Sequence, residues 1–183
     1  MIEIDTTSCQ KIHTRTIQVA TYVCEENAII VEGRLQDDRL MDSYRLDGDV
    51  VPPGVVHHLI IRMRVQGPRL EITDIEVEMP TAPIEACLEM SRSLEPVKGL
   101  PIISGFTIKA KELVGGAKGC AHLVALLMAM APAAVQGAWS AATRRPSASN
   151  KLMAHSLERM KDTCYVWRSD GPAFKNLEET LKM

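Results

Sequence analysis

The alternation of apolar side chains over residues 55–65 restricts the fold of this chain more than any other feature. One face of the predicted strand carries a histidine within an aliphatic series: Val55, His57, Leu59, Ile61, Met63 and Val65. This two-residue period predicts a β-strand with one face in the core. A polar turn at residues 66–69 and a second alternating segment at residues 70–79 follow, which predicts a β-hairpin. The second segment changes phase near Asp74, and a β-bulge there would account for the change.

An earlier pair of alternating segments, residues 15–23 and 26–37, predicts another hairpin. Residues 39–54 are polar and rich in turn formers, so we expect a long loop between the hairpins. The two hairpins together predict an antiparallel sheet of about four or more strands.

Helical segments are predicted after the strands. The first starts with Thr81 as the N-cap, and a short helical turn closes at Gly99. Residues 105–113 are compatible with either a strand or a helix, and a long apolar helix is expected from about residue 120 to 136. Strands followed by helices predict an α+β fold in which helices cover one face of the sheet. We expect a single domain over residues 1–183, with a core at about 14–137 and a C-terminal linker and helix at 138–183.

Composition excludes some functions. A formal net charge of −2 does not provide the basic surface of a general nucleic-acid-binding protein. We expect no signal peptide and no membrane span, because the apolar run at residues 121–135 is short and contains His122 and Pro132. The five cysteines are an odd number without a CxxC pair, which favours reduced thiols and a cytoplasmic protein.

The candidate site lies where a glycine-rich loop leads into the apolar helix. Gly116, Lys118 and Gly119 precede Cys120, and His122 follows two residues later. Unpaired N–H groups at a helix start stabilise a thiolate or an anionic ligand. Cys120 and His122 point to opposite sides of a regular helix, so they can converge only if Cys120 lies in the non-helical cap. The alternative is that both side chains are structural, with Cys120 as a small core residue.

His57 is an unusual residue for the apolar face of a strand. If the long helix packs over this face, His57 can meet Cys120 or His122, and Asp74 can orient an imidazole. We therefore predict a catalytic set of Cys120, His122, His57 and Asp74. The predicted ligand-binding set is Lys118, Gly116, Gly119 and His58, and the possible ligands of zinc or iron are Cys120, His122 and His57.

Residues 113–137, "LVGGAKGCAHLVALLMAMAPAAVQG", resemble an uncharacterised bacterial family in which a Gly-Cys-x-His-Leu motif opens a helix. Residues 55–65 and 162–172 are similar to the same family, and the resemblance covers about residues 14–174. It implies that Gly119, Cys120, His122 and His57 belong to the pattern of the family, although Ala121 stands where the family commonly has threonine. The resemblance implies no reaction.

The order of elements is also similar to that of iron–sulfur scaffold proteins of the NifU type. Those proteins place a ligand cysteine in the turn of the sheet, whereas residues 66–69 contain none. A cluster scaffold is therefore not expected here, while a site for a single metal ion remains open.

The leading functional hypothesis is a small cytoplasmic enzyme that acts on a small organic acid or acyl compound. Hydrolysis, isomerisation and acyl transfer remain open. The alternatives are a non-enzymatic metal- or ligand-binding protein, such as a sensor or carrier, and a structural helper subunit. The expected partner is a small molecule, and the protein is a possible homo-oligomer.

Overall fold

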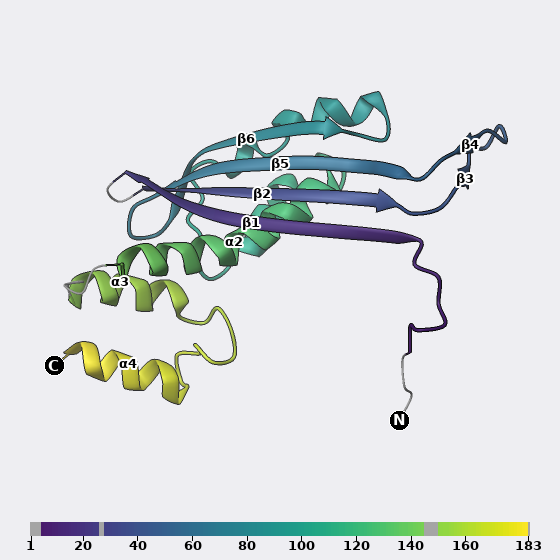
Figure 1. Cartoon of the computed structure of the whole chain (residues 1–183). Helices are drawn as coiled ribbons and strands as arrows, with labels where there is room; N and C mark the ends of the chain where they lie inside the picture. Colours follow the sequence, from purple (N-terminus) through teal and green to yellow (C-terminus); the bar gives the residue numbers. More distant parts are fainter. Residues whose placement is uncertain (1–4, 26–27, 145–149, 183) are drawn as a thin grey trace.

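A four-stranded antiparallel sheet forms the centre of the protein, and helices cover one of its faces (Figure 1). The computed structural model describes residues 5–25, 28–144 and 150–182. The order in the sheet is β1-β2-β5-β6, formed by His13–Glu25, Ala28–Arg39, Gly54–Gln66 and Glu71–Thr81. This arrangement confirms the α+β class and the antiparallel sheet predicted from the sequence.

Both predicted hairpins are present, and so is the predicted bulge. β5 pairs with β6 through Arg64↔Asp74 and Val65↔Ile72, so the register shifts at Thr73. The extra residue lets the apolar side chains of β6 change phase while Ile72 and Ile75 both remain buried.

The expected long loop between the two hairpins has structure of its own. It contains two short paired strands, β3 at Ser43–Tyr44 and β4 at Val50–Val51, which extend beyond the end of the sheet (Figure 1). Where it leads into β5, the register shifts again, because Asp37 pairs with His57 while Asp38 pairs with Val55. The residues of the candidate site described below lie at this same end of the sheet.

The helical part differs from the prediction in several details. The elements are η1 (Glu85–Arg92), η2 (Glu95–Val97), α1 (Phe106–Val114), η3 (Gly116–Lys118), α2 (Ala121–Ala142), α3 (Asn150–Met160) and α4 (Pro172–Lys182).

The prediction of Thr81 as a helix N-cap is wrong, because Thr81 ends β6 and η1 is a 3-10 helix capped at Ile84. α4 was not predicted, and Pro132 lies inside a continuous α2. The predicted linker falls partly on residues 145–149, which lie outside the described residues.

The core lies between the sheet and α2. On the inner side of α2 the fully buried residues include Leu123, Leu126, Leu127 and Met130, and those of the sheet include Val31, Leu35, Leu59 and Ile61. α2 is also long and apolar enough to cross a membrane by length and composition alone. Seven of its residues are buried in this fold.

A glycine allows α2 to approach β1 closely. A Cβ atom at Gly137 would lie 2.4 Å from Cγ2 and 2.6 Å from Cβ of Thr21. We expect Gly137→Val to lower the free energy of unfolding by about 1–3 kcal/mol, because the added methyl groups have no free volume to occupy. Urea denaturation measures the change, with the exposed Gln136→Ala as the control variant. Equal stability of the two variants would show that the helix can move away from the sheet at no cost.

Candidate functional site

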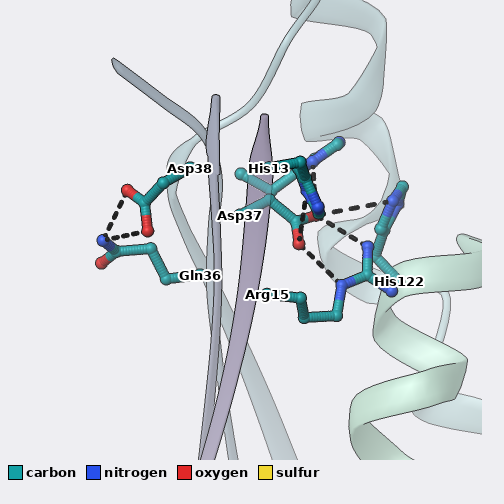
Figure 2. A network of polar contacts seen from close by, with 7 residues as sticks. His13, Arg15, Gln36, Asp37, Asp38 and His122 are labelled. Carbon is teal, nitrogen blue, oxygen red and sulfur yellow. Dashed lines mark hydrogen bonds and ion pairs between the residues drawn. The ribbon is translucent and has the colours of Figure 1, made fainter. Parts of the chain in front are cut away.

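The centre of the candidate site is the buried carboxylate of Asp37, whose side chain is only 3% exposed. The sheet register places Arg15 of β1 directly opposite Asp37 on one side and His57 of β5 opposite it on the other. Directly paired residues in adjacent antiparallel strands have Cβ atoms about 4.5–5.5 Å apart and share a face. Three side chains from three strands therefore share the face that α2 covers, and Figure 2 shows two of them, Arg15 and Asp37, in contact.

Asp37 forms ion pairs or close contacts with the basic side chains of Arg15, His13 and His57. Arg15 donates from Nε to Oδ1 at 2.6 Å and from Nη2 to Oδ2 at 2.7 Å, which is a bidentate ion pair. Nε2 of His13 lies 3.5 Å from Oδ1, and Nδ1 of His57 lies 2.9 Å from Oδ2. The hydrogen bond from Arg15 is the main reason that the pKa of Asp37 lies below its ordinary value, although burial opposes this effect. Asp37 is therefore ionised at neutral pH.

The start of α2 brings Cys120 and His122 together. Cys120 is the N-cap of the helix and has extended backbone angles (φ −91°, ψ 125°), as the predicted convergence requires. Its Sγ atom lies 3.8 Å from Nδ1 of His122. On the other side of the same ring, Nε2 of His122 lies 3.9 Å from Oδ2 of Asp37 (Figure 2). His122 thus stands between the thiol and the carboxylate.

The two histidines also contact each other. The rings of His57 and His122 have centroids 3.9 Å apart and are inclined by 31°. Burial is the main cause that lowers the pKa of His122, and the nearby His57 and Arg15 add to it, whereas Asp37 opposes it. A lowered pKa leaves the imidazole of His122 neutral at neutral pH, which is the form that can accept a proton or bind a metal ion.

One nitrogen of His57 has no suitable hydrogen-bond partner among the described residues. Nδ1 is buried, and although Oδ2 of Asp37 lies 2.9 Å away, it lies off the direction needed for a hydrogen bond. A buried polar atom without a hydrogen bond is uncommon in native proteins. The cluster of His13, Arg15, Asp37, His57 and His122, which we call the Asp37 cluster, therefore contains a binding atom that the protein does not satisfy well.

Two of the predicted site residues lie elsewhere. Asp74 is 57% exposed and forms an ion pair with Lys98 at 2.8 Å, so it does not orient an imidazole. The carboxylate that lies beside the imidazoles of His57 and His122 is that of Asp37. His58 follows His57 in β5 and therefore points to the opposite face of the sheet.

The glycine-rich loop has a structural role that the sequence did not reveal. Lys118 donates from Nζ to the backbone oxygen of Glu112 at 2.7 Å, at the end of α1, rather than to a site at Cys120. A Cβ atom at Gly119 would lie 2.5 Å from the backbone oxygen of Val114, and Gly116 has a positive φ of 61°. Gly116 and Gly119 therefore allow the tight connection between α1 and α2.

Asp37, Arg15 and His13 were not predicted as site residues from the sequence. A signal for the first two was present, because Arg15 and Asp37 continue the two-residue series that carries the apolar side chains of their strands. His57 was identified by the same reasoning. The register that places these residues of β1, β2 and β5 side by side could not be predicted from the sequence.

Comparison with known proteins identifies a family. The family model described as "Protein of unknown function (DUF2889)" matches residues 13–136. No curated protein and no solved structure matches the chain significantly. The matched segment extends from His13 in β1 into α2, and so includes Cys120 and the whole Asp37 cluster. The chain therefore belongs to the DUF2889 family.

Proposed function

We propose that the protein is a small enzyme in which the thiol of Cys120 attacks a small organic acid derivative or acyl compound. The observation that carries this proposal is the contact of 3.8 Å between Sγ of Cys120 and Nδ1 of His122 at the extended N-cap of α2. A nucleophile, a base beside it and a third group that orients the base are the usual signs of nucleophilic catalysis.

His122 is the proposed base. Cys120 transfers its proton to Nδ1 of His122, and the thiolate adds to the acyl carbon. The leaving group departs with that proton, and water or another acceptor then cleaves the thioester. The positive charge that His122 gains in the first step is stabilised by Asp37, whose Oδ2 lies 3.9 Å from Nε2. Both contacts are longer than a catalytic hydrogen bond of about 2.6–3.2 Å, and such contacts commonly shorten when substrate binds.

The charge around the site supports an anionic substrate. Asp37 supplies one negative charge, which Arg15 already neutralises through two hydrogen bonds. The three histidines and the N-terminus of α2 add only neutral or positive groups. The side chain of Arg15 is 37% exposed, so its remaining N–H groups are accessible to a carboxylate. Arg15 thus takes the role that the sequence assigned to Lys118.

The cysteines support the proposed cytoplasmic location. All five are free, including three that are exposed, and such thiols persist in a reducing compartment.

Alkylation by iodoacetamide at pH 7, followed by mass spectrometry of peptides, tests the proposal. We expect Cys120 to react at least about tenfold faster than the exposed Cys164, because Nδ1 of His122 lies beside Sγ and can accept the proton as the sulfur attacks the reagent. The variant His122→Gln should lose this advantage, whereas His58→Gln on the opposite face should keep it. Equal rates for Cys120 and Cys164 in the unmodified protein would refute the assignment of Cys120 as the nucleophile.

A further inference from the structure

We propose that Asp37, His57 and His122 bind one divalent transition-metal ion, such as zinc or ferrous iron. The binding of this ion is independent of the proposed function. The ligand set differs from the one predicted from the sequence, because Asp37 replaces Cys120.

The distances between the ligand atoms support an ion among them. Asp37, His57 and His122 each offer one oxygen or nitrogen atom, and these three atoms lie within 4.8 Å of one another. Zinc bonds of about 2.0–2.2 Å in tetrahedral geometry place two ligand atoms roughly 3.2–3.6 Å apart. The distances from Oδ2 of Asp37 to Nδ1 of His57 and to Nε2 of His122 are 2.9 Å and 3.9 Å. Only small side-chain movements therefore separate this arrangement from a coordination site.

His57 supplies an independent observation. Its Nδ1 atom is buried and makes no hydrogen bond to a described residue, although a carboxylate oxygen lies nearby. A buried polar atom without a hydrogen bond destabilises the fold, so its retention suggests a partner that the chain itself does not provide. A metal ion bound through the lone pair of Nδ1 is such a partner.

The types of ligand indicate the class of ion. Two imidazoles and one carboxylate suit zinc, ferrous iron and related ions, and they leave coordination positions open for water or substrate. Magnesium and calcium prefer oxygen ligands alone. Arg15 contacts both oxygens of Asp37 and fixes the orientation of the carboxylate, as groups around a metal site commonly do. Each carboxylate oxygen has two lone pairs, so Oδ2 can bind an ion while it accepts the bond from Arg15.

Titration of the metal-free protein with cobalt(II) tests the binding site. We expect one equivalent to bind with visible ligand-field bands and without the near-ultraviolet charge-transfer band of a cobalt–thiolate bond, because Cys120 is not a ligand. His57→Gln should weaken binding at least about tenfold, whereas His58→Gln should leave it unchanged. Circular dichroism shows whether each variant is folded. The absence of stoichiometric binding, a thiolate band, or equal weakening by both variants would overturn the site.

Discussion

Replacing Asp37 with asparagine will lower the free energy of unfolding by about 1.5–3 kcal/mol, the effect expected when a buried side chain loses its hydrogen bonds to a charged group. The side chain of Asp37 is 3% exposed and binds Arg15 through both oxygens. The neutral amide can accept only part of these bonds, and its NH₂ group faces the guanidinium. Chemical denaturation at pH 7 measures the change.

The same variant will also have a different dependence on pH. The pKa of Asp37 is lower in the folded protein than its ordinary value of 3.8, mainly because of the hydrogen bonds from Arg15. Its contribution to stability is therefore present above that value and is lost as the pH falls below it, towards the pKa of the folded state. Asp37→Asn lacks this contribution at every pH, so its loss of stability relative to the unmodified protein should shrink below about pH 4.

Asp38→Asn is the matched control for both measurements. Asp38 lies next in β2, on the opposite face, and accepts hydrogen bonds from Gln36 rather than from a cation. We expect this variant to differ by less than about 0.5 kcal/mol from the unmodified protein. A similar loss in Asp37→Asn and Asp38→Asn would mean that the Asp37 cluster does not stabilise the fold.

Leu126→Ala will lower the free energy of unfolding by about 2–5 kcal/mol, because it leaves a cavity between α2 and the sheet. Leu126 is fully buried, and its Cδ1 lies 3.0 Å from the position that a Cβ atom at Gly33 would occupy. Surrounding strands cannot move inward easily, since Gly33 lies in the central part of β2. Thermal and urea denaturation measure the loss.

Leu113→Ala in α1 is the control, because it makes the same chemical change at a side chain that is 40% exposed. We expect it to cost clearly less than Leu126→Ala. Equal losses would contradict the view that the contact between α2 and β2 is the main part of the core.

The elements that local sequence determines were predicted well. Alternation identified the four long strands, and the change of phase near Asp74 identified the bulge at Thr73. The position of Cys120 between glycines and an apolar run identified the start of α2 to within one residue. Each of these features depends on neighbours within a few positions along the chain.

The features that were missed depend on distant segments. Asp37 pairs with His57 because β5 has one extra residue, Val56, where it follows the connection at residues 40–53. No local pattern in the sequence determines this register. Asp74 was predicted to be the carboxylate of the site because a bulge was expected beside it. The bulge instead allows Ile72 and Ile75 to be buried in the core. Lys118 and the glycines likewise suggested an anion site, whereas they form the connection from α1 to α2.

The position of Arg15 on an outer strand has a consequence for how the site is maintained. β1 pairs only with β2 among the described strands, so its other edge makes no ladder hydrogen bonds in the sheet. Local opening of an edge strand requires less free energy than global unfolding. Detachment of β1 would take Arg15 and His13 away while β2, β5 and α2 retain Asp37 and the two central histidines. Hydrogen exchange in β1 is therefore expected to report how often the assembled site disassembles in the otherwise native protein.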